Sequence, residues 1–232
     1  MATTPILMIP GINASARVFQ GQMDTLWRFG PVTIADHRQA ATMAEIARGI
    51  LADAPPTFAL GGFSMGGYIA FEVLRQAPER VLKLALIDTT ARPDTSEGSE
   101  KRRQQIELTR AGKHELVASQ AFANAVHPDH AEDAALKAVH LEMARTIGPE
   151  AFIRQQEATM SRPDSRPDLG SIRVPTAIVI GEADKIIPRE HATELRDGIN
   201  AATLTIIEKA GHLAPIEQPA AVNAALEAWL AG

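Results

Sequence analysis

The chain has 232 residues, of which 45% are hydrophobic and 22% charged, and its formal net charge is −5. This length suffices for one substantial core. The acidic balance gives neither the basic patch that nucleic acid binding requires nor the lysine and arginine cluster that attracts a protein to a membrane surface. Because the chain has no cysteine, disulfides, thiolate metal ligands and a cysteine nucleophile are excluded.

The N-terminal segment is apolar, but no basic residue precedes Arg17, so it lacks the charged region of a signal peptide. No stretch approaches the roughly 18 apolar residues that a membrane span needs. We therefore expect a cytoplasmic protein with no nucleic acid or membrane partner.

Six short apolar runs alternate with longer amphipathic stretches along the chain. Runs that are apolar almost throughout are typical of strands covered on both faces. The alternation predicts an α/β fold, with a doubly wound, essentially parallel sheet of about six strands and right-handed crossovers. The apolar runs are 6–9, 32–35, 57–60, 81–87, 176–180 and 204–207, and the helical stretches are about 16–29, 41–54, 65–77, 189–198 and 219–230.

One interval interrupts this rhythm after the fourth run. Between about residues 91 and 170 the apolar positions recur at helical spacing and no strand-like run is present. The tandem repeat SRPDSRPD at 161–168 has prolines that stop helices and is typical of a hinge or linker. We predict a helical cap at 91–168, inserted into a core formed by 1–90 and 169–232. A few extra surface helices are the plainer alternative.

The segment GFSMG at 62–66 places Ser64 between a predicted strand and a predicted helix. This context indicates a nucleophile elbow, a sharp strained turn that exposes the serine Oγ at the edge of the sheet. The flanking Gly62 and Gly66 allow the strand and helix backbones to approach closely. A glycine-rich phosphate-binding turn is the alternative, but neither of its usual patterns matches these residues.

A serine hydroxyl needs a base, and the base needs an orienting acid. Asp184 follows the fifth apolar run and His212 follows the sixth, so both lie where the carboxyl ends of parallel strands gather ligands. The order Ser, Asp, His at three strand ends favours these residues. Asp184 could instead cap the helix that follows it, and Asp36 and Asp88 are rival acids because they also end strands.

The developing negative charge of an acyl-transfer reaction requires backbone donors. The N–H of Met65, directly after the nucleophile, is one candidate, and the N–H of Ile12 in the loop PGIN at 10–13 is the other. An ordinary turn is the alternative for that loop. The spacing HPDH at 127–130 is that of a metal site, but its proline favours a helix start, so we predict no metal.

These motifs together resemble the α/β-hydrolase family, in particular its small bacterial esterase and enol-lactonase members with a helical cap. The resemblance covers nearly the whole chain and is carried by GGFSMGGYIA, GEADKIIP and AGHLAPIEQP. It implies that Ser64 is the nucleophile, His212 the general base and then acid, and Asp184 the residue that orients the imidazole. It implies no cofactor.

Two departures from the family pattern stand out. Many relatives carry His-Gly where this chain has Pro10 and Gly11, and many begin with a hairpin that precedes the first strand found here. The sheet is therefore expected to be trimmed at one edge. That edge is either exposed or covered by a second subunit in a homo-oligomer.

The sequence thus predicts a serine hydrolase that cleaves a small-molecule carboxylic ester or lactone through an acyl-enzyme. Carbon–carbon bond hydrolysis and thioester cleavage use the same three residues and stay open, as does perhydrolysis. A receptor that binds a small molecule without turnover is the alternative of another class. Five apolar residues of the cap suggest a small apolar group on the substrate, or they pack the cap onto the core: Phe122, Val126, Met143, Phe152 and Met160.

Overall fold

The computed structural model describes residues 3–232; residues 1 and 2, which begin the expected core segment, lie outside the described residues. Its centre is one six-stranded sheet in the order β2-β1-β3-β4-β5-β6. Every neighbouring pair is parallel, which confirms the expected doubly wound sheet. The strands are β1 (Ile6–Ile9), β2 (Val32–Ile34), β3 (Phe58–Phe63), β4 (Val81–Ile87), β5 (Thr176–Gly181) and β6 (Thr203–Ile207).

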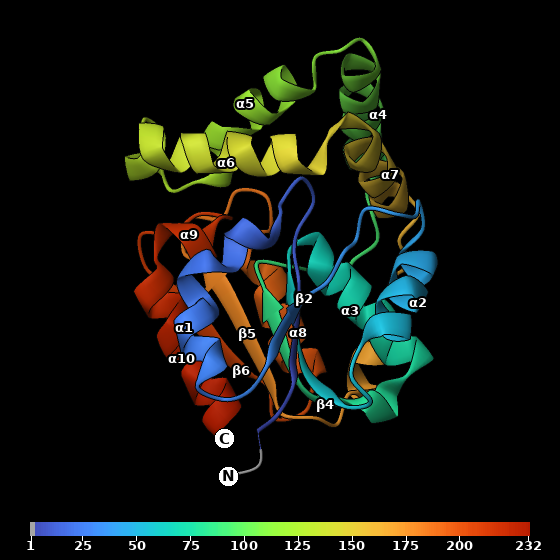
Figure 1. Ribbon diagram of the computed structural model, residues 1–232, viewed down its shortest axis with the longest axis vertical. Coiled ribbons are helices and arrows are strands. Elements are labelled where there is room, and N and C mark those ends of the chain that lie inside the picture. Colours follow the sequence, from blue (N-terminus) through green and yellow to red (C-terminus); the bar gives the residue numbers. More distant parts are fainter. Residues whose placement is uncertain (1–2) are drawn as a thin grey trace.

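Helices cover both faces of the sheet (Figure 1), and this explains why the inner strands are mostly apolar and buried. On β1, Leu7 and Ile9 pack with α2, α3 and α8, whereas Ile6 and Met8 pack with α1 and α10 on the other face. The alternation follows from the pleat of a strand. The helices of the core are α1 (Met23–Trp27), α2 (Met43–Asp53), α3 (Met65–Gln76), α8 (Arg189–Gly198), α9 (Ala214–Glu217) and α10 (Pro219–Ala231), with short 3₁₀ helices η1 (Ala16–Gln22), η2 (Pro78–Arg80) and η4 (Arg166–Ser171).

Four helices lie between β4 and β5, in the interval where the sequence shows no strand. They are α4 (Ser96–Arg110), α5 (His114–Ala125), α6 (Ala134–Ile147) and α7 (Pro149–Met160), with the 3₁₀ helix η3 (Pro128–His130) between α5 and α6. Figure 1 shows these helices together above one end of the sheet, away from the two chain termini.

The repeat SRPDSRPD returns the chain from α7 to the core and is tied to the core by several contacts. The Arg162 Nε donates to the carbonyl of Arg92, and its guanidinium carbon lies 4.4 Å from the centre of the Tyr68 ring. The Ser165 N–H donates to the carbonyl of Ala91 at 2.8 Å. The segment joins both ends of the inserted helices to the core.

The strand before Ser64 is longer than expected, because β3 extends through Gly61 and Gly62 to Phe63 rather than ending at residue 60. Gly61 pairs with Met8, and Gly62 pairs with Ile9, so parallel pairing continues through both glycines.

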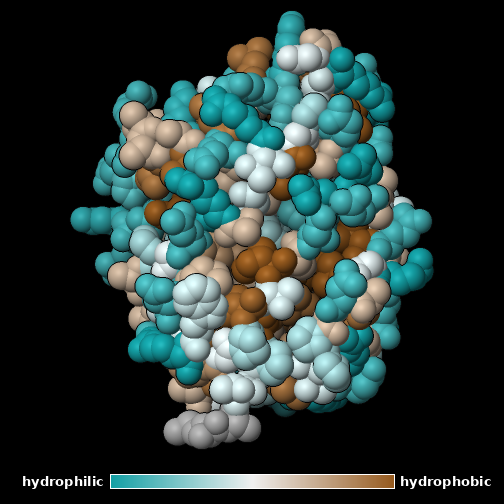
Figure 2. Space-filling model, in the orientation of Figure 1, coloured by the Kyte–Doolittle hydropathy of each residue, from teal (hydrophilic) through white to brown (hydrophobic). Residues whose placement is uncertain are grey.

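At one edge of the sheet, β2 has only three residues and is partly exposed. Figure 2, in the orientation of Figure 1, shows hydrophobic residues near the centre of the visible face of the molecule, with more hydrophilic residues around them. A short edge strand limits the backbone available for pairing with another chain.

Within residues 3–232, no helix combines the length and the apolar character that crossing a membrane would require.

Candidate active site

Ser64 lies in the turn between β3 and α3, with a φ of +53° and a ψ of −116°. A non-glycine residue rarely adopts a positive φ, so this backbone is strained and is held by its neighbours. The Ser64 N–H donates to the Ile87 carbonyl at 2.8 Å, and the Thr89 hydroxyl donates to the Ser64 carbonyl at 2.7 Å. Both partners come from the end of β4, and they fix the turn predicted from the sequence.

The glycines on either side of this turn are required by close backbone contact. A Cβ on Gly62 would lie 2.4 Å from the Gly66 carbonyl oxygen, and a Cβ on Gly66 would lie 2.1 Å from the Ile9 carbonyl oxygen. No side chain fits at such distances without movement of the backbone. The turn therefore brings β1, β3 and the start of α3 into direct backbone contact.

Ser64, His212 and Asp184 form one line of hydrogen bonds. The Ser64 Oγ lies 2.8 Å from His212 Nε2, and His212 Nδ1 lies 2.8 Å from Asp184 Oδ2. The carboxylate can only accept, so Nδ1 carries the proton and Nε2 is free to accept the serine proton. The side chains of His212 and Asp184 are 7% and 1% exposed, so bulk water hardly competes with these bonds.

The second oxygen of Asp184 is also occupied. Its Oδ1 accepts from the N–H groups of Ile186 and Ile187 at 2.8 and 2.9 Å, ahead of α8 rather than within it. These bonds fix the carboxylate against His212.

The two rival acids have other partners. Asp36 binds Arg38 and Gln39, and the Arg38 hydrogen bond is the main reason that its pKa is far below the usual range. Asp88 is fully buried, and its Oδ1 accepts from the Gly181 N–H at 2.8 Å. Burial, and then the charge of Asp184, raises the pKa of Asp88 well above its usual value.

The N–H groups of Ile12 and Met65 both belong to residues that line the cavity containing Ser64. Among the hydrogen bonds within residues 3–232, neither group donates to a protein acceptor. Met65 is the first residue of α3, so its amide also lies at the positive end of the helix dipole. Both amides are therefore available to a ligand oxygen.

The loop that contains Ile12 is held from α7, a contact that sequence reasoning missed. Asn13 has a φ of +56°, and its N–H donates to Gln155 Oε1 at 2.9 Å. Gln155 Nε2 lies 3.1 Å from His37 Nε2, which in turn lies 2.8 Å from the Gly11 carbonyl oxygen. Gln155 is completely buried. Burial also lowers the pKa of His37, so the imidazole beside Gln155 is neutral.

Glu217 of α9 holds the loop that carries His212. Its two oxygens accept from the Gly211 N–H at 2.8 Å and the His127 N–H at 2.7 Å, and the second also lies 2.9 Å from His130 Nδ1. The HPDH segment thus connects α5 and α6 to the histidine loop. Within residues 3–232, no group of three or more histidine, aspartate or glutamate side chains could hold a metal ion.

A cavity of about 460 Å³ opens over Ser64 and His212, between the core and the four inserted helices. Met143 and Phe152 line it, as do Val117 and the core residues Phe63 and Leu213.

The sequence also suggested three other residues for substrate contact that do not line the cavity: Phe122, Val126 and Met160. Phe122 and Val126 are fully buried in the core that joins α5 to the sheet.

Comparisons with known proteins point to one family. Residues 39–219 match the family model described as the alpha/beta hydrolase fold. The AB hydrolase superfamily protein YisY of Bacillus subtilis is 29% identical, over 94% of this chain and 88% of the relative. A pimeloyl-[acyl-carrier protein] methyl ester esterase of Neisseria meningitidis is 26% identical, over 97% and 92% of the two chains.

Among solved structures, a thermophilic esterase from Thermogutta terrifontis, determined with malate bound, superimposes with a TM-score of 0.90. It is 27% identical and aligns over 99% of this chain and 90% of its own. Fold, family model and relatives agree with the resemblance in the sequence motifs. The chain is therefore an enzyme that belongs to the α/β-hydrolase family.

Proposed function

We propose that the protein is a serine hydrolase that cleaves a carboxylic ester or lactone through an acyl-enzyme intermediate. The observation that carries the proposal is the hydrogen-bonded series Ser64, His212 and Asp184, with 2.8 Å at each of its two steps. A serine whose hydroxyl bonds to an oriented, neutral imidazole is the arrangement that activates an alcohol as a nucleophile.

In the first half of the proposed reaction, Ser64 Oγ attacks the substrate carbonyl carbon and passes its proton to His212 Nε2. The carbonyl oxygen becomes an oxyanion, which the N–H groups of Ile12 and Met65 stabilise; each such donor typically contributes about 3 kcal/mol to the transition state. Asp184 stabilises the imidazolium. His212 then gives its proton to the departing alkoxide. The alcohol leaves, and the acyl group remains bound to Ser64 Oγ as an ester.

In the second half, a water molecule attacks the acyl-enzyme and gives a proton to His212, and the same amides hold the second oxyanion. Collapse of this intermediate returns the proton to Ser64 Oγ and releases the carboxylic acid. With a lactone the alcohol stays attached to the acyl group, so one hydroxy acid is released.

In this proposal residues 1–90 and 169–232 are the hydrolase core and 91–168 are the cap. The cap supplies part of the cavity wall, including Met143 and Phe152, and therefore selects among substrates. The esterase names carried by two of the relatives support ester cleavage as the first choice.

The direct test is turnover of p-nitrophenyl acetate by the wild type and by Ser64→Ala. We expect the variant to lose activity by several orders of magnitude. A wild type no faster than the variant would favour the receptor alternative, in which the cavity binds a ligand without chemistry. Thioesters, lactones and diketones with a scissile carbon–carbon bond, assayed beside esters of matched chain length, distinguish the other chemistries that these three residues support.

A further inference from the structure

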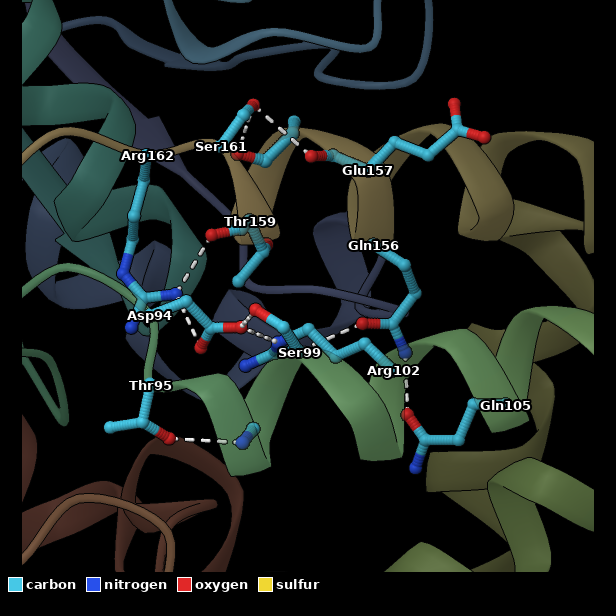
Figure 3. A network of polar contacts seen from close by, with 12 residues as sticks. Asp94, Thr95, Ser99, Arg102, Gln105, Gln156, Glu157, Thr159, Ser161 and Arg162 are labelled. Carbon is cyan, nitrogen blue, oxygen red and sulfur yellow. Dashed lines mark hydrogen bonds and ion pairs between the residues drawn. The ribbon is translucent and has the colours of Figure 1, made fainter.

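An ion cluster joins the start of α4 to the segment that follows α7 (Figure 3). The Asp94 carboxylate accepts from Arg162 Nη1 at 3.0 Å and from Arg102 Nε at 3.2 Å, so one carboxylate serves two guanidinium groups. The Ser99 hydroxyl adds a third bond at 2.8 Å. Burial opposes ionisation of Asp94, but these partners together lower its pKa, so it is charged at neutral pH.

The three charged residues of the cluster have a net charge of +1, and Asp94 and Arg162 are nearly buried whereas Arg102 keeps partial access to solvent. The side chains of Asp94, Arg162 and Arg102 are 5%, 8% and 23% exposed. The nearby Arg92 does not change this balance, because Glu194 pairs with it at 2.9 Å. A partly desolvated charge that has no partner favours the binding of a group of opposite sign.

Arg102 is the member of the cluster that lines the cavity. Its Nη1 donates to Gln156 Oε1 at 2.8 Å, and among the hydrogen bonds of residues 3–232 none uses its Nη2. Lys101, which bonds to Glu97, also lines the cavity, with the amides of Gln105 and Gln156. None of the cavity-lining residues, all of them in the described chain, is an aspartate or a glutamate.

We propose that Arg102 binds a carboxylate on the substrate, so that the enzyme cleaves esters or lactones whose acyl chain ends in a carboxylate. This inference rests on the proposed function. The cavity joins an apolar wall near Ser64 to a cationic end on α4, a distribution suited to a half-ester of a dicarboxylic acid. A single carboxylate balances the one excess charge, and it can accept a charge-assisted hydrogen bond from the Nη2 that residues 3–232 leave unused.

The test compares monomethyl esters of straight-chain dicarboxylic acids with methyl esters of the corresponding monoamides, over a series of chain lengths. The amide has nearly the shape of the carboxylate but no charge. At the best length we expect kcat/KM for the carboxylate to exceed that for the amide by about 10- to 100-fold, the typical effect of a hydrogen bond to a charged group. The ratio is taken within each protein, so a general loss of activity cancels.

Two variants assign the effect to Arg102. Arg102→Gln should bring the ratio close to one. Arg103→Gln, which removes the same charge from an exposed position on the same helix, should keep the wild-type ratio. A wild-type ratio near one at every length overturns the proposal, and this measurement requires no variant to fold. An unchanged ratio in Arg102→Gln overturns the assignment to Arg102. Ser64-dependent turnover of p-nitrophenyl acetate in either case would leave the proposed hydrolase function standing.

Discussion

Asp184 and Asp88 are two shielded carboxylates at neighbouring strand ends, and the structure gives them different partners. Asp184 accepts from the imidazole of His212, whereas Asp88 accepts from the backbone of Gly181. Only Asp184 can therefore fix the proton on His212 Nδ1. Both residues follow a strand, so their positions in the sequence do not decide which of them orients His212. The choice depends on where each carboxyl group points in the folded chain.

Because the two acids have different partners, the same aspartate-to-asparagine substitution should affect kcat differently at the two positions. Asp184→Asn should lower kcat on p-nitrophenyl acetate by about 10⁴-fold, because an amide can leave the imidazole in the wrong tautomer. Asp88 makes no hydrogen bond to Ser64 or His212 within residues 3–232, so Asp88→Asn should stay within about tenfold of the wild type. Near-normal turnover by Asp184→Asn together with an inactive Asp88→Asn would show that the acid is wrongly assigned.

Asp88 also predicts a pH dependence of stability. Its pKa is raised in the folded protein, so the folded state keeps a proton that the unfolded chain releases above about pH 4. The contribution of this group to stability is therefore complete below that pH and is lost as the pH rises toward the raised pKa. The side chain in Asp88→Asn does not titrate, so the variant does not lose stability in this way as the pH rises.

The measurement is urea unfolding of both proteins at several pH values. Measured between about pH 4 and about pH 7, the free energy of unfolding of Asp88→Asn relative to the wild type should be larger at the upper end of the range than at the lower end. A difference that is constant over this range would mean that Asp88 has an ordinary pKa in the folded protein.

At the scale of elements, the contact between β1 and the start of α3 depends on Gly66. Gly66→Ala would place a Cβ 2.1 Å from the Ile9 carbonyl oxygen, and the backbone must shift to accept it. We expect a loss of at least about 2 kcal/mol in the free energy of unfolding.

Gly49→Ala is the matched control, because nothing lies within 4 Å of a Cβ built on Gly49 in the exposed face of α2. Alanine favours a helix interior over glycine, so this variant should gain about 0.5–1 kcal/mol. Equal stability of the two variants in urea unfolding would contradict the close contact at Gly66.

The bond from Gln155 of α7 to the Asn13 N–H gives an inserted helix a role in positioning Ile12. Gln155→Leu leaves a buried donor without an acceptor and frees the loop, so we expect kcat to fall by about 10- to 100-fold, less than the loss of a whole oxyanion donor. KM should change less, because the residue does not line the cavity.

Gln155→Glu keeps an acceptor oxygen and should recover part of the lost kcat. Steady-state kinetics on p-nitrophenyl acetate checks both variants. A rise in KM with kcat unchanged would assign Gln155 to substrate binding rather than to the position of the loop.

The sequence predicted elements well where local pattern decides them. All six strands and the strand-end positions of Ser64, Asp184 and His212 follow from apolar runs and their bounding residues. The continuation of β3 through Gly61 and Gly62 was missed, because glycine has a low strand propensity, and pairing with β1 overrides it. The Gln155 contact was beyond reach, since no local pattern links residues 142 positions apart.

At the scale of the whole molecule, the site is assembled from three strand ends and completed by helices from a separate part of the chain. Parallel topology brings the ends of β3, β5 and β6 to one edge, which explains how residues 148 positions apart form one hydrogen bond. A cytoplasmic location, and a homo-oligomer that covers the β2 edge, stay predictions from the sequence.

The proposed chemistry requires Ser64 to be a nucleophile that His212 activates, and covalent labelling with a fluorophosphonate tests this directly. Intact mass and peptide mapping should find one adduct, on Ser64, and the labelling rate should fall by orders of magnitude in His212→Ala. A wild type that stays unlabelled, an adduct on another residue, or a His212→Ala variant labelled at the wild-type rate would contradict it.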